Sequence, residues 1–357
     1  MQDFAGRAAI AGIGLTELSR RSGLGEQALA VRACRLACAD AGIEPREVDA
    51  VLSYHLGDSA PAVAVAAALG IERLGWHNDI WGGGTQTASI LGDAALLISS
   101  GLARHVLIYR AMNGRSGRRL TTLPTGRQDA YTRPYGLAGP LPMFGLAATR
   151  YLHDTGLTEE HLHAVVAQSR ANAAANPRAQ RRDPLPLDDY LRLPYVCSPL
   201  RAADCCQEND GGCALLVSGV LDGPRIRAVV RAGGPGCSAM DRAPDVTTIF
   251  SAYVAPMLWS ASGARPADVD AALLYDAYSW LVPRQLTDFG LTREPGPYLL
   301  ERRHAWVNPH GGLLSEGYVH GLNNVAQAVR ELRAGRSLAL VTGFGGSYGS
   351  AALLESG

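Results

Sequence analysis

Side chains that can move protons gather in one glycine-rich stretch near the end of the chain, residues 307–349. Tyr318 lies there between His310 and His320, which are placed to orient it. A phenol has an ordinary pKa of about 10 and starts as a proton donor. Pairing with a second phenol or with other donors can lower that pKa enough for the phenol to act as a base. We therefore expect acid–base chemistry in this stretch.

Metal and nucleotide cofactors are not indicated. The chain has seven cysteines, and none forms a CxxC pair or a Cys/His cluster with zinc spacing. Asp204, Glu208 and Asp210 form an acidic cluster that also lacks metal-ligand spacing. We interpret the cysteines as reduced, mostly buried thiols. The string GFGG lacks the strand–turn–helix context of a dinucleotide site, so we predict no metal and no tightly bound cofactor.

A repeated unit positions the proton-moving residues. A glycine turn ending at Gly84 precedes a helical run that stops at Gly101, and a strand follows at residues 106–110. The same order recurs later, from Gly317 through a helical run to Gly335 and a strand at residues 337–342. Such self-similarity indicates a duplicated unit.

Strands and helices alternate along the rest of the chain, which favours a mainly parallel sheet covered by helices on both faces. The predicted strands are residues 8–14, 48–53, 213–217, 226–232 and 271–275, and the predicted helices are residues 26–41, 60–69, 145–155, 158–176 and 279–289.

This paired layout resembles the thiolase superfamily. The segments SPLRAADCCQENDGG at residues 198–212 and HGGLLSEGYVHG at residues 310–321 are similar to its lipid-transfer-protein branch, the sterol-carrier-protein-x type of thiolase. The resemblance implies an α/β thiolase fold, with two similar βαβαβ-type halves in a five-layered α-β-α-β-α arrangement and an inserted loop region. We predict an N-terminal half at residues 1–117 plus 193–221, an insertion covering the active site at 118–192, and a C-terminal half at 222–357.

The residues that a thiolase uses are replaced. The nucleophilic cysteine aligns with Gly84, and the second reactive cysteine of degradative thiolases aligns with Gly343. The Asn-Glu-Ala-Phe box, often His-Asp-Cys-Phe in the lipid-transfer branch, reads Tyr-Asp-Ala-Tyr from Tyr275, and Gly-His-Pro has become Gly-Tyr-Val around Tyr318. Without a nucleophile the usual covalent acyl-enzyme route is excluded, whereas acid–base chemistry is not.

These substitutions resemble the steroid side-chain aldolases of the family, which split a β-hydroxyacyl-CoA into a ketone and propionyl-CoA. Our hypothesis is that Tyr275 and Tyr318 are the acid–base pair of such a retro-aldol cleavage. The sequence does not tell which phenol is the base. We expect support for the enolate oxygen and the phenols from the remaining polar and glycine positions, namely Gly84, Asn308, His310, His320, Gly343 and Gly345.

The substrate implied by the resemblance is a CoA thioester. In the family the insertion contacts coenzyme A, and guanidinium groups suit phosphates and adenine rings. Arg115, Arg118 and Arg119 are the candidates here. The resemblance also implies a homodimer and a small OB-fold, zinc-ribbon partner, together forming a heterotetramer.

Charge and hydropathy exclude other partners. The 33 basic and 33 acidic side chains balance, which argues against nucleic acid or an anionic membrane as a partner. No apolar run is long enough to span a bilayer, and the N-terminus lacks a signal-peptide pattern, so we expect a cytoplasmic protein.

Two other interpretations stay open from sequence. One is a thiolase-like acyltransferase subunit whose nucleophile comes from a partner. The other is a non-catalytic lipid- or acyl-CoA-binding homologue, in which the two tyrosines only fill apolar space.

Overall fold

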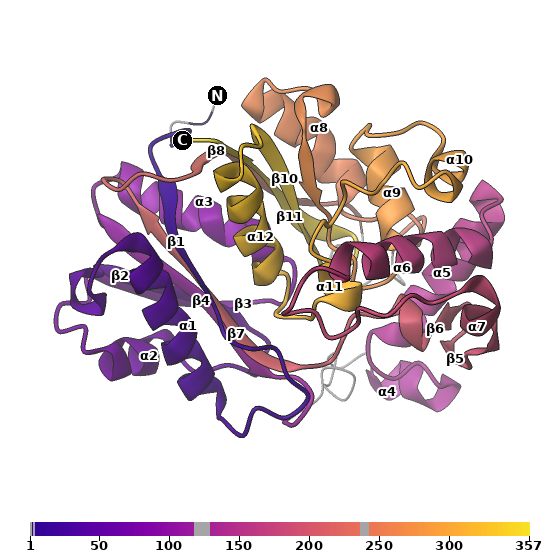
Figure 1. Cartoon of the computed structure of the whole chain (residues 1–357), viewed down its shortest axis with the longest axis horizontal. Helices are drawn as coiled ribbons and strands as arrows, with labels where there is room; N and C mark the ends of the chain where they lie inside the picture. Colours follow the sequence, from indigo (N-terminus) through magenta and orange to yellow (C-terminus); the bar gives the residue numbers. More distant parts are fainter. Residues whose placement is uncertain (1, 3, 118–128, 236–242) are drawn as a thin grey trace.

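The computed structural model describes residues 2, 4–117, 129–235 and 243–357, and shows two strand-and-helix halves with a helical segment against one of them (Figure 1). The first half contains β1 (Ala9–Leu15), α1 (Glu26–Ala41), β2 (Ala50–His55), α2 (Ala62–Leu69), β3 (Trp76–Trp81), α3 (Gln86–Ser99), β4 (His105–Asn113) and β7 (Asp210–Ser218).

The remaining elements follow between β4 and β7 and after β7. The intervening segment contains α4 (Asp129–Thr132), α5 (Leu141–Thr155), α6 (Glu159–Ala173), α7 (Leu187–Arg192), β5 (Tyr195–Cys197) and β6 (Leu200–Arg201). The second half contains β8 (Arg225–Gly233), α8 (Ser251–Ser262), β9 (Ala271–Leu273), α9 (Leu281–Asp288), α10 (Pro295–Leu300), α11 (Gly312–Ser315), α12 (Leu322–Arg333), β10 (Leu338–Phe344) and β11 (Tyr348–Glu355).

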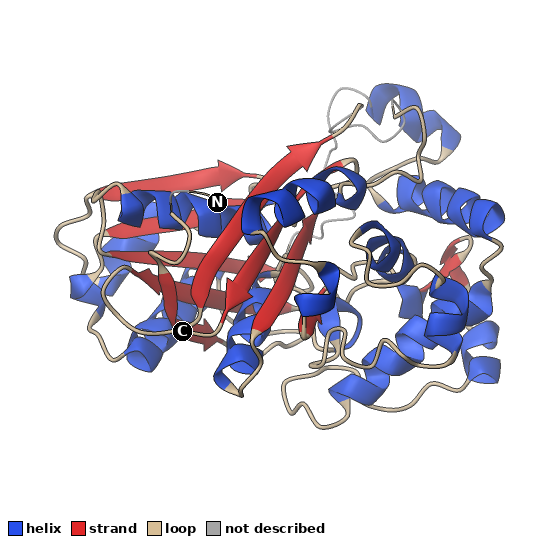
Figure 2. Ribbon diagram, turned by 90° about the horizontal axis from the view of Figure 1, so that it is seen from above, coloured by secondary structure: helices blue, strands red, loops and turns tan. Residues whose placement is uncertain are grey.

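Five layers stack as the resemblance to thiolases implies (Figure 2). The middle layer consists of α3 and α12. Helix α3 packs on β8, β10 and β11 on one side and on β2, β4 and β7 on the other. Helices α1 and α2 cover the outer face of the first half, and α8 covers that of the second. Helix α3 suits the middle because its apolar residues face both sheets, so Ile90, Leu91 and Ala94 are all fully buried.

The sheet order is β3-β2-β4-β7-β1-β8-β11-β10-β9, and the two halves meet at a single pairing of Ala9 with Arg225. The expectation of a mainly parallel sheet is wrong. Strand β2 is parallel to β3 and β4, and β9 to β10, but the pairs β4–β7, β7–β1, β8–β11 and β10–β11 are antiparallel. The sequence indicated the strand–helix–strand crossovers, which join parallel strands. It did not indicate the direction of β7, which follows the long intervening segment, or of β11, which follows β10 through a tight hairpin.

The duplicated unit brings two glycine turns to the middle layer. Helix α3 ends before Gly101 and leads to β4, and α12 ends before Gly335 and leads to β10; both glycines have the left-handed φ that ends a helix. The turns that precede α3 and α12 hold Gly84 and Tyr318, so one unit from each half delivers its turn to the same region. The three-segment division of the chain stays a prediction.

The helices in the described ranges do not cross a membrane, because none of them is both long and apolar enough to do so.

Candidate active site

Two buried phenols meet between the halves. The hydroxyl oxygens of Tyr275 and Tyr318 are 2.7 Å apart, and their rings pack edge to face. Tyr275 lies two residues after the end of β9, and its backbone N–H donates a hydrogen bond to Thr342 Oγ1. Tyr318 lies between α11 and α12, and its N–H donates to Asn209 Oδ1. The two phenols that the sequence places 43 positions apart are thus hydrogen-bonded partners.

The phenol of Tyr275 packs against Gly84, the position that the resemblance to thiolases aligns with their nucleophilic cysteine. A Cβ atom added to Gly84 would lie 2.1 Å from Tyr275 Oη, so residue 84 has no room for a side chain. Gly84 lies two residues before α3, and the Tyr275 oxygen therefore sits near the positive N-terminal end of that helix. Residues 84 and 275 constrain each other, because the phenol of Tyr275 in the second half fits only if residue 84 in the first half is a glycine.

Burial sets the protonation state of the pair. Desolvation raises the pKa of Tyr275 well above its ordinary value, and the hydrogen bond from Tyr318 opposes this rise. Desolvation and the proximity of Tyr275 also raise the pKa of Tyr318 well above normal. The expectation that pairing lowers one phenol's pKa below its ordinary value is therefore wrong, because burial outweighs the partner's hydrogen bond. Both phenols are protonated at neutral pH.

An aromatic wall borders the phenols. Phe344 at the end of β10 stacks obliquely on Tyr275, with ring centroids 6.0 Å apart, and on Phe144 of α5 at 5.1 Å. Phe144 in turn contacts Tyr278 at 4.9 Å. Phe144 belongs to the inserted segment, so that segment forms part of the apolar surface beside the pair.

Asp276 and Asn308 shape the turn before Tyr318. Asp276 accepts hydrogen bonds from the N–H groups of Leu313 and Leu314 at the start of α11, while burial raises its pKa to about 7. Asn308 has a left-handed φ, and its side-chain amide donates to Leu274 O. The amide nitrogen that we expected to contact the enolate is therefore engaged in holding β9.

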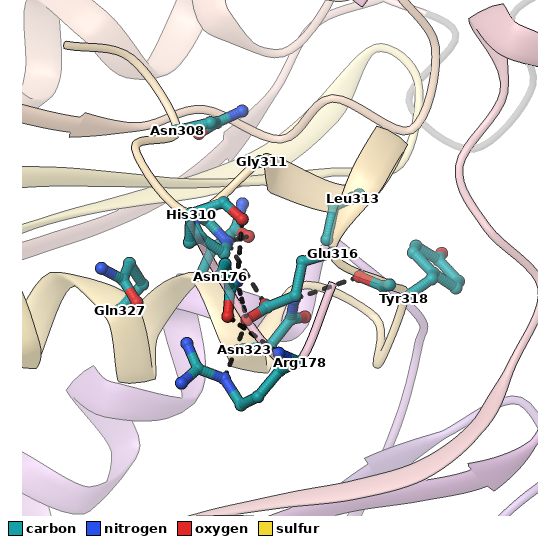
Figure 3. Close-up of polar contacts among 12 residues, drawn as sticks. Asn176, Arg178, Asn308, His310, Gly311, Leu313, Glu316, Tyr318, Asn323 and Gln327 are labelled. Atoms are coloured by element: carbon teal, nitrogen blue, oxygen red, sulfur yellow. Dashed lines mark hydrogen bonds and ion pairs between the residues drawn. The ribbon is translucent and has the colours of Figure 1, made fainter. Parts of the chain in front are cut away.

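Glu316 is a fully buried carboxylate that ties the insertion to this turn (Figure 3). It accepts hydrogen bonds from Asn176 Nδ2 at 3.0 Å, Arg178 Nε at 3.1 Å and Asn323 Nδ2 at 2.9 Å. His310 Nε2 lies 3.5 Å from Glu316 and 3.2 Å from Asn324 Oδ1. His310 thus faces the Glu316 carboxylate rather than the phenols.

His320 lies against the phenols. Its ring packs edge-on to Tyr318 with centroids 5.0 Å apart, and its Nδ1 accepts a hydrogen bond from Arg110 Nε at 2.9 Å. Arg110 is fully buried and pairs with Asp58 at 2.6 Å. Sequence reasoning missed Arg110 and Asp58, since the partner of Arg110 is 210 residues away. The available signal was an arginine at the end of the otherwise apolar strand 106–110.

The remaining glycine and arginine candidates differ in where the structure places them. A Cβ atom on Gly343, near the end of β10, would lie 2.5 Å from Gly84 O, so this strand packs directly against the glycine turn before α3. The N–H of Gly345 already donates to Tyr348 O within the β10–β11 turn. Arg115 lies 3.8 Å from Glu208 and is partly exposed. Arg118 and Arg119 lie outside the described residues.

Neither metal nor thiol chemistry is supported by the residues that the structure describes. They contain no cluster of His, Cys, Asp and Glu side chains able to hold a metal ion. Burial and the neighbouring Asp204 raise the pKa of Cys205 to about 12, and burial raises that of Cys206 well above normal. These thiols stay protonated and are poor nucleophiles.

Comparison with known proteins gives full-length relatives, although no family model matches the chain. The 17-hydroxy-3-oxo-4-pregnene-20-carboxyl-CoA lyase of Mycobacterium tuberculosis is 34% identical, over 92% of each chain. The steroid side-chain-cleaving aldolase of Thermomonospora curvata is 35% identical, over 93% of this chain and 92% of the relative. The solved Ltp2-ChsH2(DUF35) aldolase superposes with a TM-score of 0.92 at 33% identity, over 99% of both chains. Human mitochondrial 3-ketoacyl-CoA thiolase shares the fold alone, with a TM-score of 0.74 at 16% identity over 99% of this chain and all of the thiolase.

Proposed function

This chain belongs to the steroid side-chain-cleaving aldolases, which are lyases with the thiolase fold, and we propose that it cleaves a β-hydroxyacyl-CoA by retro-aldol chemistry on its tyrosine pair. The observation that carries the proposal is the 2.7 Å contact between the hydroxyls of Tyr275 and Tyr318, beside a residue 84 that has no side chain. Acid and base are present together, and a covalent acyl carrier is absent from the position where thiolases need one.

In this mechanism Tyr275 is the base. Its oxygen lies near the positive end of α3, and Tyr318 can donate a hydrogen bond to it once it is ionised, so both effects favour the ionised form of Tyr275 over that of Tyr318. The Tyr275 phenolate takes the proton of the β-hydroxyl, whose electrons form the ketone. The Cα–Cβ bond breaks, and its electron pair moves into the thioester to give an enolate.

Tyr318 is then the acid. It protonates the α-carbon of the enolate and becomes a phenolate. The proton held by Tyr275 crosses the 2.7 Å hydrogen bond to Tyr318, which restores the starting pair. The cycle needs no oxidant and no acyl-enzyme, and it moves one proton from oxygen to carbon.

The substrate we propose is a CoA thioester with a bulky, steroid-like acyl chain, split into a ketone and propionyl-CoA. A relative is named for a steroid-derived CoA thioester, and the aromatic wall of Phe344, Phe144 and Tyr278 offers flat apolar surface for fused rings. Arg115, with Arg118 and Arg119, is proposed to meet the phosphates of CoA. CoA enters as part of the substrate, and no resident cofactor is needed.

The assembly we propose is a homodimer that binds a small OB-fold partner to form a heterotetramer in the cytoplasm. Strand β3 lies at the edge of the sheet and leaves Trp81 70% exposed. Edge strands are normally covered, and pairing with a second copy would cover this one. The partner is suggested by the solved relative, whose name joins Ltp2 to a DUF35 protein.

The test is product analysis by mass spectrometry, with the purified chain and its partner on a panel of β-hydroxyacyl-CoA thioesters. Tyr275→Phe and Tyr318→Phe should each lower kcat by about 100- to 10,000-fold, because each removes a proton-transfer group. Tyr109→Phe, which removes another buried hydroxyl that donates to Ala60 O at 2.6 Å, is the matched control and should keep full activity.

Three results would contradict the proposal. Full activity in both phenylalanine variants would remove the tyrosine mechanism. Acyl transfer without carbon–carbon cleavage would favour an acyltransferase subunit. Binding without turnover would favour a non-catalytic homologue.

A further inference from the structure

The hydrogen bond between Arg110 and His320 fixes where the histidine carries its proton. Arg110 Nε donates to His320 Nδ1 at 2.9 Å. A guanidinium group has donors only, so Nδ1 must be the unprotonated nitrogen of the ring. In a neutral imidazole the proton is then on Nε2. His320 is therefore held as the Nε2–H tautomer.

The same arginine keeps the ring neutral. Arg110 is fully buried and is paired with Asp58 at 2.6 Å, so its charge is compensated and stays in place. Burial and this neighbouring cation lower the pKa of His320 to about 3, against a weaker opposing effect of Asp58. A neutral ring whose Nδ1 is occupied cannot take a proton from a substrate, but it can donate one hydrogen bond through Nε2.

The backbone holds the His320 ring beside the phenol of Tyr318. His320 has a φ of 46°, a left-handed conformation that histidine rarely adopts, and its carbonyl accepts hydrogen bonds from Tyr54 Oη at 3.0 Å and Thr87 Oγ1 at 2.6 Å. The ring is held between Tyr318 and the glycine turn before α3. A Cβ atom added to Gly83 would lie 3.2 Å from His320 Nε2, so the glycine lets this nitrogen lie close to the turn before α3.

Among the described residues, no atom accepts a hydrogen bond from Nε2, although His320 as a whole is only 1% exposed. Nε2 is not one of the fully enclosed atoms that lack a partner, so it keeps a small accessible area through which an acceptor can reach it. The left-handed backbone of this non-glycine residue carries a conformational cost. A histidine that only filled the core would need neither a strained backbone nor a buried Arg–Asp pair to hold its tautomer. These features together indicate that the acceptor comes with the substrate.

We propose that His320 Nε2–H donates a hydrogen bond to the thioester carbonyl oxygen as that oxygen becomes the enolate oxygen, with Arg110 and Asp58 as the positioning residues. This inference rests on the proposed retro-aldol function and adds to it the group that stabilises the enolate. The hydrogen bond strengthens as charge moves from the breaking Cα–Cβ bond to the oxygen, so it lowers the barrier more than it strengthens substrate binding.

The tautomer of His320 can be tested by NMR, without an activity assay. In ¹⁵N NMR of the full chain, the His320 signals are identified among the nine histidines by their loss in His320→Asn. We expect a pyridine-type Nδ1 and a pyrrole-type Nε2, unchanged in Tyr109→Phe. The double variant Arg110→Met/Asp58→Asn, which removes the cation without leaving a buried carboxylate unpaired, should mix the tautomers. A protonated Nδ1 in the unaltered protein would overturn the inference.

Kinetics test the donor itself. The amide nitrogen of glutamine reaches about as far as Nε2, whereas that of asparagine reaches only as far as Nδ1. His320→Asn should lower kcat by about 100- to 1,000-fold with little change in KM. His320→Gln should be at least about tenfold faster than the asparagine variant. Asparagine tolerates the left-handed conformation better than glutamine does, so a slower asparagine variant cannot be attributed to misfolding.

The outcomes separate this inference from the function on which it rests. If the unaltered protein cleaves no β-hydroxyacyl-CoA, the proposed function fails. If it cleaves one and both His320 variants lose activity equally, or neither loses any, the donor role fails while the tyrosine mechanism stands. Binding of propionyl-CoA should also shift the Nε2 signal, and an unchanged signal under saturating propionyl-CoA would count against the contact.

Discussion

At the scale of single residues, the site is defined by an exchange of volume across the two halves. Tyr275 fills the place that Gly84 leaves empty, and Tyr318 meets it there. The sequence singled out these two tyrosines because they fall at motif positions, and the structure brings their hydroxyls together, while their catalytic role stays a prediction. It did not predict their raised pKa values or the Arg110–His320 bond, because burial and contacts between distant segments leave no local pattern.

Gly84→Ala tests this exchange of volume. The added Cβ would lie 2.1 Å from Tyr275 Oη, so Tyr275 must move, and we expect a loss of about 1–3 kcal/mol in the free energy of unfolding together with loss of turnover. In a Tyr275→Ala background the same change should cost almost nothing, and chemical denaturation of the four proteins gives the coupling energy. Gly75→Ala is the control, since its nearest contact would be an ordinary 3.4 Å. Equal costs of Gly84→Ala in both backgrounds would show that the two positions are independent.

The raised pKa values predict how the rate depends on pH. The proposed base is active as a phenolate, and burial raises the pKa of Tyr275 well above its ordinary value. The active form is therefore a minority at pH 7, and kcat/KM should rise by about tenfold per pH unit as pH increases from 7 towards 9. Steady-state rates measured across that range, with circular dichroism to verify folding, check this. A flat profile would contradict a phenol base.

At the scale of elements, the helices that position the site were predictable and several strands were not. Residues 26–41, the helical run ending at Gly101 and the one ending at Gly335 carry apolar periodicity and a glycine stop, and the structure has helices there. Strand β3 was missed because its sequence, WHNDIW, alternates poorly and lies at an exposed edge. Helix α8 was missed, and it contains Pro256. Strand β11 was missed as well, because its first residues belong to the glycine-rich stretch that ends at residue 349.

The turn that carries Tyr318 depends on Glu316, whose carboxylate braces α11 and α12 against the insertion. Burial opposes ionisation of Glu316, but His310, Asn323, Asn176 and Arg178 outweigh it and hold its pKa below the ordinary value. Glu316→Ala would remove the acceptor that Asn176, Asn323 and Arg178 share, leaving Asn176 and Asn323 with one hydrogen bond each. We expect a loss of about 1.5–3 kcal/mol in the free energy of unfolding, measured by denaturant titration.

A matched variant separates this effect from simple loss of charge. Glu301→Ala removes an exposed carboxylate that lies 3.9 Å from Arg303, and its unfolding free energy should change by less than about 0.5 kcal/mol. Equal stability of the two variants would show that the Glu316 carboxylate does not brace the turn.

At the scale of the whole molecule, the resemblance gave the five layers correctly, while strand direction needed the structure. The two halves share one pairing between their sheets, so their alignment depends on α3 and α12, which pack against each other and against both sheets. Tyr318 lies in the turn before α12, and the hydroxyl of Tyr275, which follows β9, reaches the turn before α3. The active site is therefore a product of how the halves pack, and neither half contains it alone.

The open edge of β3 predicts the oligomeric state. Trp76 and Trp81 are exposed on an edge strand, and a second copy pairing there would bury them. We expect a dimer at micromolar concentration by analytical ultracentrifugation, and a monomer for Trp76→Lys/Trp81→Lys. Leu102→Lys, a change at another exposed apolar residue, should stay dimeric. A monomeric unaltered chain would contradict the proposed edge pairing.

The absence of a side chain at Gly84 also determines which inhibitors act on this enzyme. Electrophilic acyl-CoA analogues inactivate cysteine-dependent condensing enzymes by alkylating the sulfur, and here the corresponding position offers no sulfur to alkylate. Among the described cysteines, Cys206 interacts electrostatically with both phenols, and burial keeps Cys206 and its neighbour Cys205 as unreactive thiols. An organism that carries both kinds of enzyme could thus have its thiolases blocked by such a reagent while this carbon–carbon cleavage continued.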